Sequence, residues 1–121
     1  MTNEQRAENL IKELGFEFGT ISKDYIISLL EDEIKNYHEG SSEYSRLLCG
    51  YLFCLGDETD VPLLKKAKYD INMDVGCMID EEWIQSLENG GFPGYNLRSK
   101  EQLMTGFILY YQNFEADDED L

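Results

Sequence analysis

The sequence predicts an all-α domain of about six helices. Apolar residues recur at intervals of three and four along most of the chain, which is the spacing of one face of an α-helix. Residue types that cap helices stand before several of these segments. Only two prolines occur among the 121 residues, so few positions interrupt a helix. Together these observations favour helices over strands.

The first expected helix begins after Thr2, because Thr2 and Gln5 have the spacing of a capping box. Apolar residues follow at helical intervals as far as Gly15, which is placed to end the helix. Residues 16–21 form a short apolar connection. Residues 22–38 then carry a second amphipathic pattern, so a second helix is expected there.

The third helix carries the clearest pattern in the chain. Its apolar positions form one stripe that Phe53 and Cys54 widen, so this helix is expected at the centre of the domain. Ser42 is placed to cap the helix and Gly56 to end it. The stripe consists of Tyr44, Leu47, Leu48, Tyr51, Leu52 and Leu55.

A fourth helix is expected to open at Asp57. Asp57 and Asp60 put carboxylates in its first turn, where the helix dipole and the unpaired N–H groups favour negative charge. Pro62 is tolerated so early, because first-turn N–H groups have no partner within the helix. Residues 70–78 show no clear period and are expected to be irregular.

The remaining sequence predicts two further helices. Asp80 is placed to cap a fifth helix that ends at Glu88. Residues 89–98 contain a glycine-rich loop. Ser99 and Gln102 form a second capping box before the last helix. The apolar positions that mark this helix are Leu103, Met104, Phe107, Ile108, Tyr111 and Phe114.

The length of the chain fits one domain. We expect residues 1–114 to form a single α-helical domain. Residues 115–121 are mostly acidic and are expected to form a frayed C-terminal tail.

The junction between the third and fourth helices has the sequence Leu-Gly-Asp-Glu-Thr-Asp-Val-Pro-Leu-Leu, residues 55–64. It resembles the inter-helix turn of HEAT-like repeats, commonly written L-G-D-x-x-x-V-P-x-L. The resemblance covers residues 43–69, and no second copy occurs at a fixed spacing. It implies an irregular HEAT-like stack of helix pairs, or one such pair within another helical bundle. Such repeats are mostly binding scaffolds.

The net charge of −15, from 25 acidic and 10 basic residues, limits the partners to expect. Phosphate binding requires clustered lysines and arginines, so neither nucleic acid nor an anionic membrane is an expected partner. A basic protein is the complementary partner, because opposite fields raise association rates. The alternative is that the acidity serves only solubility.

The cysteines and the N-terminal segment indicate a reducing, cytoplasmic location. Cys49, Cys54 and Cys77 include no C-x-x-C pair, which argues against a disulfide framework and a zinc site. Cys49 and Cys54 are expected in the core. The N-terminal segment has no basic region followed by an apolar one, and no apolar run approaches the roughly 18 residues of a membrane span.

Catalytic signals are weak, so we expect neither an enzyme nor a cofactor. His38, the single histidine, would have to serve any hydrolytic triad, but it stands where a helix C-terminus favours a cation. The glycine-rich loop lacks the phosphate-binding patterns G-x-G-x-x-G and G-K-[ST]. Cys77 has no identifiable base or orienting partner.

The sequence therefore favours a small acidic protein-interaction domain. By class it resembles immunity proteins that neutralise a basic toxin or enzyme by occluding its active site. The best candidates for partner binding are acids at the expected inter-helix turns. Phe92 and Tyr95 are candidates for aromatic anchors, with the core as the alternative place for either. These acids are Asp57, Glu58, Asp70, Asp74, Asp80, Glu81 and Glu82.

An alternative function uses some of the same carboxylates. Oxygen ligands on a loop suit Ca²⁺ or Mg²⁺, which would make the protein a divalent-metal-binding module or a metal-dependent enzyme. The spacing lacks the pattern of an EF-hand loop. The candidate ligands are Asp70, Asp74, Asp80, Glu81 and Glu82.

Overall fold

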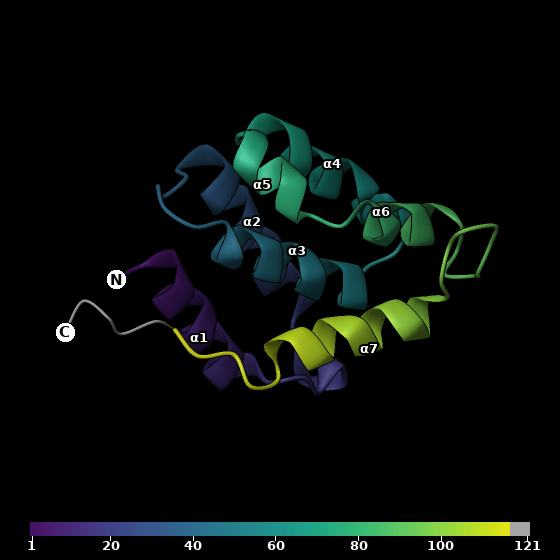
Figure 1. Cartoon of the computed structure of the whole chain (residues 1–121), viewed down its shortest axis with the longest axis horizontal. Helices are drawn as coiled ribbons and strands as arrows, with labels where there is room; N and C mark the ends of the chain where they lie inside the picture. The colour runs from purple at the N-terminus through teal and green to yellow at the C-terminus, as the bar shows by residue number, and fades with distance from the viewer. Residues whose placement is uncertain (117–121) are drawn as a thin grey trace.

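The structure, a computed structural model, describes residues 1–116. Helices make up the regular secondary structure of this part of the chain (Figure 1), and its one β-pairing is an isolated bridge between Gly94 and Leu97. The predicted all-α class is therefore confirmed, with one α-helix more than the six or so expected. The elements are α1 (Asn3–Leu14), η1 (Phe18–Thr20), α2 (Lys23–Lys35), α3 (Glu43–Leu55), η2 (Glu58–Asp60), α4 (Val61–Asp70), α5 (Met73–Met78), α6 (Glu81–Glu88) and α7 (Lys100–Tyr111).

Side chains identified in the sequence fix several helix starts. Both capping boxes form: Thr2 and Gln5 exchange hydrogen bonds at α1, and Ser99 and Gln102 do so at α7. Asp80 accepts a backbone hydrogen bond at the start of α6. These bonds satisfy N–H groups that have no partner within the helix, which is why such residues mark helix starts reliably.

The predicted cap of α3 is wrong in detail. Ser42 occupies the N-cap position but makes no capping hydrogen bond with its side chain. Its ψ of 4° lies outside the extended region that a capping residue adopts. The neighbouring Ser41 hydroxyl instead accepts the Glu43 N–H, at 3.3 Å.

Helix α2 is shorter than predicted and ends at Lys35 rather than near His38. Asn36 leaves the helical region, with a ψ of 52°. The buried side chain of Asn3 donates to the carbonyl oxygens of His38 and Ser41, at 2.9 and 2.8 Å. These carbonyls are therefore satisfied by a distant side chain, and this contact from α1 favours a loop over another helical turn.

The expectation that residues 70–78 are irregular is wrong, because α5 lies there. Asn72 caps it by accepting the Val75 N–H. Gly76 allows α5 to approach α4 closely, since a Cβ at this position would lie 2.6 Å from the Lys68 carbonyl oxygen. The Lys68 ammonium in turn donates to the Gly76 carbonyl at 2.7 Å. This short helix depends on tertiary contacts that a sequence period does not reveal.

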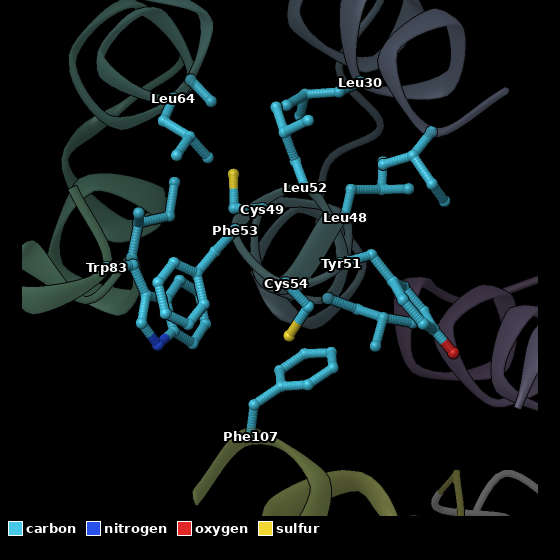
Figure 2. Close-up of a cluster of buried hydrophobic side chains, with 14 of the residues drawn as sticks. Leu30, Leu48, Cys49, Tyr51, Leu52, Phe53, Cys54, Leu64, Trp83 and Phe107 are labelled. Carbon is cyan, nitrogen blue, oxygen red and sulfur yellow. The ribbon is translucent and has the colours of Figure 1, made fainter. Parts of the chain in front are cut away.

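Helix α3 is the centre of the domain, as predicted. Ten of its thirteen residues are buried. Figure 2 looks along α3, whose side chains point outward to the surrounding helices. Phe53 stacks on Trp83 of α6, with ring centroids 5.9 Å apart. Tyr51 meets Phe107 of α7 edge to face, at 5.4 Å.

The C-terminal end of the described chain differs slightly from prediction. Helix α7 ends at Tyr111, so Phe114 packs on Tyr111 from beyond the helix, with ring centroids 5.6 Å apart. Ala116 is buried. The rest of the predicted frayed tail, residues 117–121, lies outside the described residues. None of the helices in residues 1–116 is both long and apolar enough to cross a membrane.

Candidate functional site

The structure distributes the seven predicted partner-binding acids over three places. One group precedes α4, a second lies at the corner between α4 and α5, and the third begins α6. The first two groups are at opposite ends of α4, a ten-residue helix about 15 Å long. The groups are Asp57 with Glu58, Asp70 with Asp74, and Asp80 with Glu81 and Glu82.

The first group borders a small hollow. Asp57 is exposed and accepts hydrogen bonds from the backbone N–H and the hydroxyl of Thr59, which lower the pKa of its carboxyl group. Glu58 beside it is also exposed. The hollow has a volume of about 220 Å³ and is lined by Gly56, Asp57, Glu58, Leu87, Gly90, Gly91 and Lys100.

Lys100 is the cation in this hollow, and it is held in place. Its ammonium donates to the Gly56 carbonyl at 2.9 Å and lies 5.5 Å from the centroid of the Phe53 ring. Burial lowers the pKa of Lys100. The two carboxylates at the rim therefore face solvent, while the lysine is directed at the backbone.

The chain leaves this hollow as a hairpin that projects beyond the ends of α6 and α7 (Figure 1). Gly94 and Leu97 exchange two backbone hydrogen bonds of 3.0 Å each. Asn96 turns the chain with a φ of 58°, in the left-handed region that asparagine tolerates. Tyr95 is 97% exposed and Phe92 is 71% exposed.

Several bonds hold the base of this hairpin. The Lys100 N–H donates to the Gly91 carbonyl at 3.0 Å. Arg98 binds Glu82 through two guanidinium nitrogens, at 2.7 and 3.2 Å. The hydrogen bond from Arg98 is the main reason that the pKa of Glu82 is lowered. Glu82, predicted to bind a partner, thus has a partner within the domain.

The corner between α4 and α5 forms a second surface. Asp70 and Asp74 are exposed there, beside Tyr69 at 64% and Met73 at 83% exposure. Tyr69 and Met73 were not among the surface residues expected from the sequence. The available signal was that Tyr69 lies off the apolar stripe of its helix. An open hollow of about 480 Å³ lies here, lined by Lys68, Tyr69, Asn72, Met73, Gly76 and Cys77.

Residues suited to metal binding or catalysis are dispersed. In the part of the chain that the structure describes, no group of three or more His, Cys, Asp or Glu side chains is arranged to hold a metal ion. His38 lies 3.5 Å from Glu33, a buried carboxylate that also binds Arg6. Burial raises the pKa of the Cys49 and Cys54 thiols to about 12, so neither is a ready nucleophile.

Comparison with known proteins finds no matching family model, no similar curated protein and no similar solved structure. The hairpin region brings exposed carboxylates and exposed aromatic rings together. Its carboxylates attract cationic groups, and its exposed aromatic rings offer apolar area that a partner can bury.

Proposed function

We propose that the protein is an interaction domain that binds a basic protein partner through a hairpin site. This site comprises the hollow beside Asp57 and Glu58 and the adjoining hairpin with Phe92 and Tyr95. The observation that carries the proposal is the 97% exposure of Tyr95 on a hairpin closed by two backbone hydrogen bonds. An exposed aromatic side chain is typical of binding hot spots, and a backbone closed by hydrogen bonds loses less conformational entropy on binding than an open loop does.

Charge supports a cationic partner. The net charge of −15 attracts a basic protein over long range and raises the rate of encounter. At short range, Asp57 and Glu58 stand at a hollow whose volume suits one long side chain of a partner, such as lysine or arginine. Gly90 and Gly91 line the same hollow and directly precede Phe92, which brings the charged and the aromatic parts of the site together.

An immunity-type role is the form of interaction we favour. In this role the domain neutralises a basic toxin or enzyme by covering its active-site cleft. Small size, strong acidity and a protruding aromatic hairpin support it. We further propose that the protein acts in the cytoplasm, because Cys49, Cys54 and Cys77 are free thiols, as a reducing compartment keeps them.

We also propose that α3 and α4 form a HEAT-like helix pair. The turn between them supports this, because Gly56 is the C-cap of α3 and Asp57 forms a capping box with Asp60. An experimental structure in which this pair fails to superpose on known HEAT repeats rejects the proposal.

Binding to a basic partner tests the main proposal. The tagged protein is used as bait in lysate of its source at low salt and again at high salt, because exposed ion pairs weaken as salt rises. The captured partner is purified, and its affinity is measured by calorimetry. We expect a basic protein whose affinity falls at least tenfold with Tyr95→Ala, and again with the double variant of Asp57→Asn and Glu58→Gln.

Matched controls come from the corner between α4 and α5. Tyr69→Ala removes another exposed tyrosine, and the double variant of Asp70→Asn and Asp74→Asn removes the same number of charges. These variants should leave affinity unchanged. If the corner variants weaken binding and the hairpin variants do not, the hairpin site is wrong. If the captured partner is not basic, the charge argument is wrong as well.

A further inference from the structure

We infer that a cavity between α3, α6 and α7 binds a small oxyanion group, a carboxylate or a phosphate. The cavity has a volume of about 190 Å³ and lies apart from the hairpin hollow. Two of the chain's three arginines, Arg46 and Arg98, line it together with one carboxylate residue, Asp80. This concentration is notable in a chain with 25 acidic and 10 basic residues.

Aromatic rings surround Arg46, and its Nη1 nitrogen lacks a hydrogen-bond acceptor. Its guanidinium carbon lies 4.2 Å from the centroid of Tyr110, 5.1 Å from that of Trp83 and 5.3 Å from that of Tyr111. Such contacts stabilise the faces of the guanidinium, whereas its N–H groups lie in its plane and need oxygen acceptors. One of them, Nη1, is buried and has no hydrogen-bond partner among residues 1–116.

The nearby carboxylates are bound to other groups. Glu82 accepts from Arg98, and Asp80 accepts from the Glu82 N–H. Glu43 accepts from the hydroxyls of Tyr110 and Tyr111. Within residues 1–116 no carboxylate lies within ion-pair distance of Arg46. Arg46 lines the cavity, so an oxyanion that enters it would supply a compensating charge. For the oxyanion to accept a hydrogen bond from the buried Nη1, the surrounding rings have to shift.

Gly106 points to the same cavity independently. It lies in the middle of α7, where glycine destabilises a helix relative to alanine. Packing does not require it, because a Cβ at this position would meet nothing within 4 Å. Gly106 lines the cavity, so the absent side chain keeps this space open for a ligand.

Tryptophan fluorescence tests the inference directly, because Trp83 is the single tryptophan and lines the cavity. The full chain is titrated with sodium phosphate and with sodium acetate, against sodium chloride at constant ionic strength. We expect a saturable change with at least one oxyanion at millimolar concentration and none with chloride. A linear response, or the same response to chloride, overturns the inference.

Variants locate the binding. Arg46→Gln should weaken it at least tenfold. Gly106→Leu should also weaken binding at least tenfold, because the leucine side chain fills the cavity. If circular dichroism shows that Arg46→Gln does not fold, the affinity of Gly106→Leu decides the test. Lys65→Gln removes one positive charge from the exposed pair with Glu88 and should leave affinity unchanged. Equal binding by folded Gly106→Leu overturns the inference.

The source of the oxyanion is distinguished with peptides. A short peptide with a free C-terminal carboxylate is compared with the same peptide amidated. Tighter binding of the free peptide than of acetate identifies a peptide terminus as the ligand, and tighter binding of phosphate or acetate identifies a free small anion. Equal binding of both peptides, with no response to phosphate or acetate, rejects an oxyanion site.

Discussion

Arg6 and Arg46 form a natural pair for comparison, because each packs over a tyrosine ring but only one has a carboxylate partner. The Arg6 guanidinium lies 3.9 Å from the Tyr44 centroid and binds Glu33 with both terminal nitrogens, at 2.7 and 3.1 Å. The Arg46 guanidinium lies 4.2 Å from the Tyr110 centroid and has no ion pair within residues 1–116. The Arg6 guanidinium therefore has both a ring and a carboxylate as partners, whereas the Arg46 guanidinium has rings but leaves one N–H donor without an acceptor.

The largest expected effect separates these two arginines. Arg6→Met removes both guanidinium donors from Glu33, a carboxylate that is 1% exposed and keeps only longer contacts with His38, and breaking such a buried pair costs about 3 kcal/mol of unfolding free energy. Arg46→Met strands no carboxylate and loses mainly the contact with the rings, about 1 kcal/mol. Urea denaturation of both variants measures the difference. Equal losses would show that Arg46 has an internal partner after all.

The second expected effect comes from a substitution beside Arg46 that leaves the Arg6 site intact. Gly50 lies one helical turn after Arg46 on α3, and a Cβ there would lie 2.2 Å from Cε1 of Phe107. Gly50→Ala therefore has to displace the buried Phe107 ring, at a cost of about 2 kcal/mol. Urea denaturation measures the loss, and Trp83 fluorescence should shift because its ring contacts Phe107.

The site around Arg6 supplies the control for this change. Ala7 is a fully buried residue of α1, and Ala7→Gly weakens this helix without adding any atom to the core. It should lower stability by about 1 kcal/mol and leave the Trp83 emission maximum unchanged. A native emission spectrum in Gly50→Ala would mean that α3 and α7 do not approach as closely as the structure indicates.

The two sites also differ in how far the sequence alone predicts them. The caps Thr2 and Ser99 were predicted correctly because their hydrogen-bond partners lie within four residues, and the stripe of α3 because its residues recur along one helix face. Two other predicted caps were wrong: Ser42 makes no capping hydrogen bond, and Asp57 caps η2 rather than opening α4. Helix α5 and the ordered hairpin rest on contacts between distant segments, such as Arg98 with Glu82, and no periodicity encodes these.

The candidate sites show the same division. The sequence left two places open for Phe92 and Tyr95, a surface anchor or the core, and both side chains are exposed. The separation of the predicted acids over both ends of α4 and the start of α6 was not foreseen, since turns that are close in sequence lie at different ends of a helix. The cavity at Arg46 was missed entirely, because an arginine within an apolar stripe looks like a surface residue until the rings of α6 and α7 enclose it.

The third expected effect uses alkaline pH, because both sites contain buried tyrosines. Burial is the main cause that raises the pKa values of Tyr44 and Tyr111 above their ordinary value near 10. A folded state that holds a proton more tightly loses stability as pH rises, so this contribution is complete below pH ~10 and is lost above it. Each tyrosine contributes a slope of at most about 1.4 kcal/mol per pH unit in that range.

Phenylalanine variants assign this slope. Tyr111→Phe should flatten the alkaline loss of unfolding free energy more than Tyr44→Phe, since Tyr111 is fully buried at 0% exposure and Tyr44 is at 8%. The measurement is urea denaturation between pH 9 and 11, a range chosen around the ordinary pKa of tyrosine of roughly 10. An unchanged slope in both variants would assign the alkaline loss to other groups, of which the buried thiols of Cys49 and Cys54 are the first candidates.

The smallest expected effect is a gain, and it bears most directly on why the Arg46 site is incomplete. Gly106→Ala should raise unfolding free energy by about 1 kcal/mol, because alanine is the better helix former and its Cβ meets no neighbour. A more stable residue was therefore available at this position without any clash. If Gly106→Ala is more stable and also binds the oxyanion more weakly, then the natural glycine lowers stability and keeps the cavity open for the ligand. If Gly106→Ala destabilises the domain, then packing requires the glycine. Gly106 then no longer supports the oxyanion site, and the proposal rests on the surroundings of Arg46 alone.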